Sequence, residues 1–323
     1  MGHSKNGKAG WRARWRLQAV VLAAPVVLAV TGSLATGQEA SVAVVPDADA
    51  FVRSLAPTGN YGGAGALSVS GAAAANGSGV QNGLFSAFMR FPMSNAVAWA
   101  DSVFGGHDWI VTEIRLSVNE MAAPDNPIFD RGVGAFEIRW IAEGDWLEGT
   151  GTPKSPTSDG VTWQDLPLVL NSNVDRSLGV FMNRGEDGQE SYSLALAEPF
   201  LTDLRHGGEV SLYLVAWSPE IGFTFNSRNF GNTNAQPALE VTAVANPKPQ
   251  IGAIAVVGKS ASVSFATVPN WTYTLQCASG LEAPGAGYWS NLLTVPAQPV
   301  GSNVVFLDTA AGPKKLYRLS VSP

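Results

Sequence analysis

Carboxylates and tryptophans are concentrated in one loop of the chain, residues 144–163, which reads GDWLEGTGTPKSPTSDGVTW. Two carboxylates about 5 to 9 Å apart can hydrolyse a glycosidic bond, and carboxylates in a glycine-rich turn can bind calcium. Tryptophan rings can stack on sugars or brace a fold. We expect the carboxylates to accept hydrogen bonds from the backbone N–H groups of turns and caps. We assign the loop a bracing role, carried by Trp146, Glu148 and Trp163.

Histidine and cysteine form no recognisable catalytic arrangement. His107 and His206 both lie beside glycine in turn-like contexts, and the sequence has no HExxH, no Gly-x-Ser-x-Gly and no Cys/His pairing. Cys277 lies on the apolar side of a predicted strand, where a thiol packs like a small hydrophobe. We therefore predict a protein that is not an enzyme. A polysaccharide lyase or hydrolase is the least favoured alternative.

Strand alternation places three arginines opposite apolar side chains. Apolar residues on one face of 84–91 leave Arg90 on the other face, and the same pattern applies to Arg139 and Arg228. Tyr213 and Trp217 likewise share one face of a strand. Arginine forks bind carboxylates in bidentate fashion, and aromatic rings stack on sugars. This combination predicts non-catalytic binding of an acidic, uronate-type polysaccharide.

Two other arrangements of these side chains stay open. Each arginine can pair with an acid on its own face, as Arg139 with Glu137. The face that carries Tyr213 can be buried by the second sheet or by the helix predicted at 198–205. The corresponding alternative function is a structural or adhesive cell-surface protein without glycan specificity.

The N-terminal segment has the three parts of a secretory signal. Five basic residues without an acid precede the apolar run 17–30, and the small residues Ser33-Leu34-Ala35 follow it. We predict a signal peptide over residues 1–35 and a secreted or cell-surface protein, with an uncleaved anchor as the alternative. No second apolar run is long enough to span a membrane, so no membrane contact is expected after removal of the signal.

Charge disfavours several classes of partner. The chain has 20 basic and 26 acidic residues, and loss of the five basic residues of the signal leaves 15 against 26, a formal charge of −11. Such a charge disfavours nucleic acid and anionic membranes as partners. Cys277 is the single cysteine, so an exported chain must fold without an internal disulfide. The sequence leaves the oligomeric state open.

Apolar and polar residues alternate with period two along most of the chain, and helical periodicity is rare. Residues 111–118 and 135–141 alternate clearly, whereas 84–91 and 210–217 are apolar at nearly every position, as in central strands covered on both faces. The one plausible helix is 198–205. Many short strands and long glycine-rich loops predict an all-β chain built as an antiparallel sandwich.

Several short motifs follow one another through the first two thirds of the chain. They are Asp49-Ala-Phe-Val-Arg53, Asn60-Tyr-Gly-Gly63, Leu67-Ser-Val69, Ala87-Phe-Met-Arg-Phe91, Trp146-Leu-Glu-Gly149, Gly160-Val-Thr-Trp163, Ser227-Arg228 and Pro237-Ala-Leu239. In this order they resemble the DNRLRE-domain family of extracellular bacterial modules, which overlaps with carbohydrate-binding module family 96. A glutamate often follows the last arginine in that family, whereas this chain has Asn229. The resemblance covers residues 41–245 and implies a jelly-roll β-sandwich.

A domain boundary is predicted at residues 246–250, where two prolines in a polar pentapeptide make a stiff linker. The following residues, 251–323, have their own strand pattern. Within them, Val268-Pro-Asn-Trp-Thr-Tyr-Thr-Leu-Gln276, Trp289, Asp308 and Leu316-Tyr-Arg318 resemble a small module found at the C-termini of many exported proteins of Verrucomicrobia-type bacteria. This resemblance implies a smaller, fibronectin-III-like β-sandwich.

The jelly-roll resemblance also implies a structural calcium ion, because such modules often bind one through loop carboxylates and backbone carbonyls. The candidate ligands are Asp47, Asp49, Asp125 and Asp130. The sequence has no EF-hand or nonapeptide spacing, so this expectation depends on the resemblance alone. No other cofactor is expected.

Overall fold

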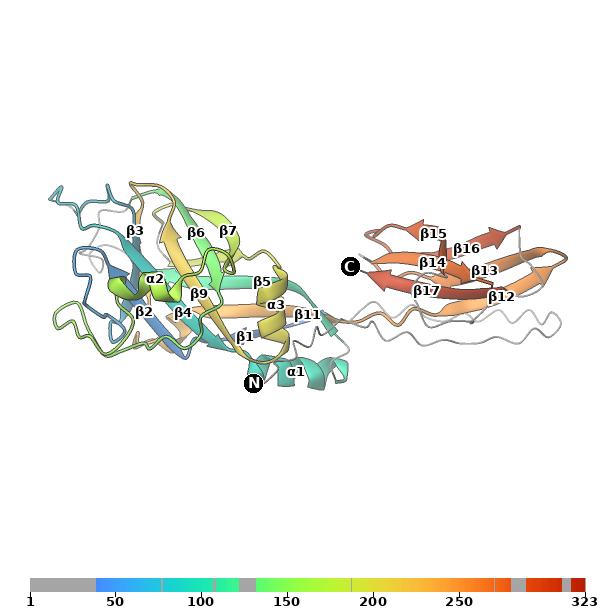
Figure 1. The fold of residues 1–323 in the computed structure, drawn as a ribbon, viewed down its shortest axis with the longest axis horizontal. Coiled ribbons are helices and arrows are strands. Elements are labelled where there is room, and N and C mark those ends of the chain that lie inside the picture. The colour runs from blue at the N-terminus through green and yellow to red at the C-terminus, as the bar shows by residue number, and fades with distance from the viewer. Residues whose placement is uncertain are drawn as a thin grey trace, which may run out of the picture. The chain divides into compact units, whose positions relative to one another are not determined.

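Antiparallel strands dominate the described part of the chain, which confirms the all-β prediction. The structure is a computed structural model, and the described residues are 39–76, 78–106, 109–121, 132–186, 188–269, 271–279, 289–309 and 315–322. They fall into two units, 39–246 and 247–323, and each is described by itself (Figure 1). The predicted signal peptide 1–35 lies outside the described residues. Within them, no helix is long and apolar enough to cross a bilayer.

Eleven strands of the larger unit hydrogen-bond into one antiparallel sheet, in the order β1-β11-β5-β10-β3-β4-β9-β6-β7, with β2 beside β4 and β8 beside β5. The junctions of β10 with β5 and of β3 with β4 are single residue pairs, Phe225–Glu120 and Ser70–Phe85. Side chains of β4, β5 and β11 share one core, so the sheet folds over on itself as a sandwich. The strands are β1 (Glu39–Val44), β2 (Ala48–Arg53), β3 (Ala66–Ser70), β4 (Phe85–Pro92), β5 (Trp109–Glu120), β6 (Gly134–Ile141), β7 (Arg176–Asn183), β8 (Gly188–Ser193), β9 (Glu209–Ala216), β10 (Gly222–Asn226) and β11 (Ala238–Ala245).

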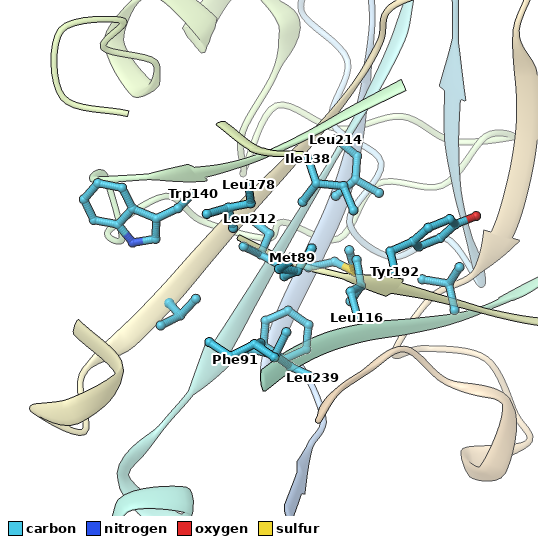
Figure 2. Packing of buried hydrophobic residues seen from close by; sticks show 14 of the residues in the cluster. Met89, Phe91, Leu116, Ile138, Trp140, Leu178, Tyr192, Leu212, Leu214 and Leu239 are labelled. Carbon is cyan, nitrogen blue, oxygen red and sulfur yellow. The ribbon is translucent and has the colours of Figure 1, made fainter. Parts of the chain in front are cut away.

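The main core lies between the inner faces of these layers. Figure 2 shows Met89 and Phe91 of β4 beside Leu116 of β5 and Leu239 of β11. All four side chains are fully buried, as period-two alternation predicts for one face of each strand. Burial of a side chain of this size stabilises the fold by about 1.5–3 kcal/mol. The inner faces therefore hold the sandwich together.

The helix predicted at 198–205 is present as α3 (Glu198–Arg205), with an acid in its first turn and a base in its last turn, as the helix dipole favours. A second long helix, α1 (Ser94–Phe104), was not predicted. Its fully buried residues are Ala96 and Ala100, and Val97, Trp99 and Phe104 pack partly buried against the core. The remaining helical turns are η1 (Trp163–Asp165), α2 (Leu166–Val169) and η2 (Thr233–Ala235).

The smaller unit consists of two three-stranded antiparallel sheets, with the orders β12-β13-β16 and β15-β14-β17. Phe265 of the first sheet and Tyr273 of the second bring their rings to within 6.2 Å between centroids, so the sheets pack as a small sandwich. Cys277 is buried, as predicted. The strands are β12 (Ile251–Val257), β13 (Ser260–Ala266), β14 (Thr272–Ala278), β15 (Ser290–Val295), β16 (Asn303–Asp308) and β17 (Leu316–Ser322).

Candidate functional site

The loop between β6 and β7 covers the outer face of the layer formed by β2, β4 and β9. A second apolar cluster joins alanines of β2, Phe88 of β4 and Tyr213 of β9 to Trp146, Val161 and Val169 of the loop. In Figure 1 the short helix α2 of this loop lies over the same strands. The outer face that was predicted to bind glycan is therefore largely covered by the chain's own loop.

Trp146 anchors this covering loop. Its ring lies 5.5 Å from the ring of Phe88, and its indole Nε1 donates a hydrogen bond of 3.0 Å to the hydroxyl of Ser211. Trp163 is partly buried against the same cluster. A buried indole with a satisfied N–H stabilises a loop on a sheet, which is what a bracing role requires.

Arg90 connects the covering loop to β4. Its Nε forms an ion pair with Asp47 at 3.0 Å, and its Nη1 donates to the carbonyl oxygens of Gly144 and Trp146, each at 3.1 Å. The guanidinium also lies 5.5 Å from the ring centroid of Trp146. These contacts occupy Arg90 within the fold, so the prediction that it faces an open ligand surface is wrong.

Arg139 and Tyr213 are neighbours in the β6–β9 register, but they do not form an open site. Arg139 Nε pairs with Glu137 Oε2 at 2.7 Å, which is the alternative that the sequence left open. Tyr213 is only 5% exposed, and its hydroxyl donates to Ser86 at 3.0 Å. Trp217 is 63% exposed. The predicted shared surface of Tyr213 and Trp217 is wrong, because the 142–170 loop buries Tyr213.

Arg228 belongs to a polar network with Glu148 and Asp49, well separated in sequence. Its Nη1 donates to both oxygens of Glu148, at 2.8 and 3.0 Å, and its backbone N–H donates to Asp49 at 2.6 Å. The backbone N–H of Asp49 and the amide of Asn229 also donate to Glu148, at 3.2 and 3.3 Å. The neutral Asn229 thus adds a donor where a glutamate would place a second carboxylate beside Glu148.

Asp49 is completely buried, and its Oδ1 has no hydrogen-bond partner among the described residues. Burial raises the pKa of Asp49 to about 7, although the N–H of Arg228 favours the charged form; the charge of Glu148 raises this pKa further. A carboxyl group in this setting holds its proton up to neutral pH.

Of the four aspartates predicted to bind calcium, the two that the structure describes already have hydrogen-bond partners in the chain. Asp47 is engaged by Arg90, and Asp49 by the N–H of Arg228. No group of three or more His, Cys, Asp or Glu side chains able to hold a metal occurs in the described part of the chain. Asp125 and Asp130, like His107, lie outside it. Calcium binding therefore stays a prediction.

Asp159 of the 144–163 loop and Asp165, just after it, accept hydrogen bonds within local turns. Asp159 accepts hydrogen bonds from the hydroxyls of Thr157 and Thr150, at 2.6 and 2.7 Å, and from the backbone N–H of Thr150 at 3.0 Å. These bonds lower the pKa of Asp159 to about 2. Asp165 accepts from the backbone N–H and the hydroxyl of Thr162. Asp159 acts as a turn acceptor, as predicted for this loop, and Asp165 acts as a cap acceptor at the helical turn that follows it.

A pocket in a different part of the larger unit contains an arginine that pairs with no acid of the described residues. This pocket, of about 190 Å³, lies where the end of β2 meets the loops that follow it. None of the described residues that line it is acidic. They are Phe51, Arg53, Tyr61, Asn76, Asn82, Phe85 and Pro153.

Arg53 is the charged group of this pocket. Its Nε donates to the carbonyl oxygen of Asn82 at 3.2 Å, and its guanidinium lies 5.2 Å from the ring centroid of Phe85. Its two terminal nitrogens make no hydrogen bond and no ion pair with any described residue. Arg53 therefore differs from Arg90, Arg139 and Arg228, whose charges are matched by acids of the chain.

Tyr61 and Asn76 add further donors to the pocket. The ring of Tyr61 stacks on Phe51, with centroids 4.6 Å apart, and its hydroxyl makes no hydrogen bond to the described residues. Asn76 Oδ1 accepts from the N–H groups of Ser78 and Val80, which leaves Nδ2 as an unused donor. Sequence patterns did not predict this pocket; the one local signal is that Arg53 ends its strand with no acid directly after it in the sequence.

Comparisons with known proteins leave the family open. No protein-family model matches the chain, and no curated protein matches it. Among solved structures, the chain aligns with the glycoside hydrolase domain of Endo-D (Spr0440) from Streptococcus pneumoniae R6 at 7% identity and a TM-score of 0.15. The alignment covers 88% of this chain and 37% of that one, so the chain spans little more than a third of that structure's length. A likeness this weak carries no argument, and the DNRLRE resemblance stays a prediction.

Proposed function

We propose that the larger unit is a non-catalytic module that binds acidic, uronate-type polysaccharide, and that the pocket around Arg53 receives a carboxylate of the polymer. The supporting observation is the guanidinium of Arg53: among the described residues, its terminal nitrogens have no partner and none of the residues that line its pocket is acidic. Two unused nitrogens of one arginine match the two oxygens of a carboxylate. The N-terminal pattern predicts that this module acts outside the cell or at its surface.

Each side chain of the pocket has a distinct part in the proposed binding. Phe85 supports the guanidinium through a cation–π contact, while Tyr61 and Asn76 offer donors to the hydroxyl groups of a sugar. A volume of about 190 Å³ is below the roughly 300–1,000 Å³ typical of sites for drug-sized ligands. The pocket therefore suits one sugar unit of a polymer. Repeated units compensate for weak binding of each by raising the local concentration of ligand.

Affinity gel electrophoresis of the protein without residues 1–35 tests this proposal. Gels that contain alginate or polygalacturonate are compared with gels that contain a neutral glucan, with and without a chelator. We expect the acidic polymers to retard the protein and the neutral one to leave its mobility unchanged. Loss of retardation in the chelator would indicate that the predicted calcium takes part.

Arg53→Ala locates the site, and Arg115→Ala is its matched control. Arg115 is an exposed strand arginine that pairs with Glu113 at 2.8 Å and does not line the pocket. We expect Arg53→Ala to abolish retardation and Arg115→Ala to preserve it, with the melting temperature unchanged in both. The proposal fails if the folded protein is retarded by neither acidic polymer.

The second candidate function is a structural or adhesive module without glycan specificity. It is favoured by the covering loop and by the pairing of Arg90, Arg139 and Arg228 with acids of the chain, which leave the predicted glycan surface closed. A folded protein that migrates alike in acidic, neutral and polymer-free gels would favour this alternative.

A further inference from the structure

The pocket around Arg53 adjoins a second pocket of different character. This second pocket has a volume of about 280 Å³, and Phe51 and Pro153 line both pockets. Its other walls include Ala64, Ala66 and Met121. Its position beside a polar, donor-rich pocket suggests that both contact one ligand.

The second pocket presents almost no polar group to a ligand. Phe230 completes its apolar walls, and none of the described residues that line it is charged. Ser68 is its one hydroxyl side chain, and that hydroxyl already shares a hydrogen bond of 3.3 Å with Thr224. A sugar hydroxyl placed here would lose its hydrogen bonds to water without replacing them, which is unfavourable. An apolar substituent would instead gain from leaving water.

We propose that the two pockets form one composite site for an O-acetylated acidic polysaccharide, with a uronate carboxylate on Arg53 and the acetyl methyl group in the apolar pocket. This inference rests on the proposed function and narrows its ligand class. The shared wall of Phe51 and Pro153 requires the carboxylate and the acetyl group to lie close together on the polymer, on one sugar unit or on neighbouring units. Burial of one methyl group corresponds to a gain in affinity of about fourfold.

The test uses one alginate preparation in two forms, chemically O-acetylated and then de-esterified with mild alkali. Because the two forms share chain length and carboxylates, a difference in retardation reports on the acetyl groups. We expect the acetylated form to bind the protein without residues 1–35 about fourfold more tightly per site. Arg53→Ala should weaken binding to both forms.

Gly65→Leu separates the apolar pocket from the charged one. A Cβ at Gly65, which lines the apolar pocket, would meet no atom within 4 Å, and the backbone there is outside the left-handed region. The variant should therefore fold and fill the pocket. We expect it to bind both forms equally, as tightly as the wild type binds the de-esterified form. Gly208→Leu is the control, since a Cβ there makes only an ordinary contact of 3.6 Å and the residue lines neither pocket.

The outcomes separate this inference from the proposed function. If the wild type binds both forms equally, the composite site is wrong while acidic polysaccharide binding stands. If a folded Gly65→Leu variant keeps the wild-type preference, the acetyl group does not occupy the apolar pocket, and the inference is again wrong. If neither form is bound, the proposed function fails as well.

Discussion

The guanidinium of Arg228 holds the carboxylate of Glu148 with two hydrogen bonds from Nη1, at 2.8 and 3.0 Å, although the residues are 80 positions apart. This pair joins the segment after β10 to the loop that covers the outer face of the sandwich. Glu148 in turn accepts from the backbone N–H of Asp49 in β2. One carboxylate therefore ties together three segments that are far apart in the sequence.

Glu148→Ala should lower the free energy of unfolding by about 1–3 kcal/mol, because Arg228 and the N–H of Asp49 lose their acceptor in a partly buried site. The pair is partly exposed, so solvent keeps the loss below that of a fully buried pair. Urea unfolding at pH 8 measures the change. Glu113→Ala, which breaks the exposed pair with Arg115, should cost no more than about 1 kcal/mol. Equal losses in the two variants would contradict this assignment.

Asp49→Asn should change the pH dependence of stability. The pKa of Asp49 rises from 3.8 in the unfolded reference to about 7 in the fold, so the folded state retains a proton that the unfolded state releases above pH 4. The contribution of Asp49 to stability is therefore greatest below pH 4, falls as the pH rises towards 7, and is constant above that.

The neutral asparagine removes this decline. The free energy of unfolding of Asp49→Asn, relative to the wild type, should therefore increase between pH 4 and 7, by at most about 4 kcal/mol. Glu148 and Arg228 also face Asp49, and they are unchanged in the comparison. Denaturant titrations at pH 4, 5.5, 7 and 8, with EDTA present, provide the measurement. A difference that does not vary with pH would show that folding does not raise the pKa of Asp49.

Trp146→Ala should destabilise the larger unit by about 3–5 kcal/mol, because it removes a buried ring and leaves the hydroxyl of Ser211 without its donor. Trp217→Ala removes an exposed ring of the same type and should change stability by no more than about 0.5 kcal/mol. Trp217→Ala should also leave retardation in acidic gels unchanged. Weaker retardation of this variant would indicate that Trp217 contacts the polysaccharide, as the sequence predicted, and would argue against the pocket around Arg53.

Arg53→Lys should bind acidic polysaccharide more weakly than the wild type but more strongly than Arg53→Ala. Lysine keeps the positive charge but lacks the planar fork that matches both carboxylate oxygens. Retardation of the wild type should decline as NaCl is raised, since this partly exposed charge pair is screened by salt. Equal binding by Arg53→Lys and the wild type would show that Arg53 contributes only its charge and that the planar guanidinium does not matter.

Local sequence patterns correctly predicted the inner faces of the sandwich. The alternation around Phe85, Met89 and Phe91 predicted their burial, because successive side chains of a strand point to opposite faces of the sheet. The helix predicted at 198–205 is present as α3. The same reasoning missed α1, whose buried side chains are alanines and whose position depends on packing against distant strands.

The sequence by itself determined the all-β class, the core-facing side of the main strands and the turn-forming character of the 144–163 loop, because these depend on neighbours only a few residues away. Alternation can place Arg90, Arg139 and Tyr213 on an outer face, but it cannot say what covers that face. Only the tertiary structure decided this, since a loop 50 to 80 residues from β4 supplies the cover. It likewise left Arg53 without an acidic partner among the described residues, because ion pairing depends on which distant segments meet in space.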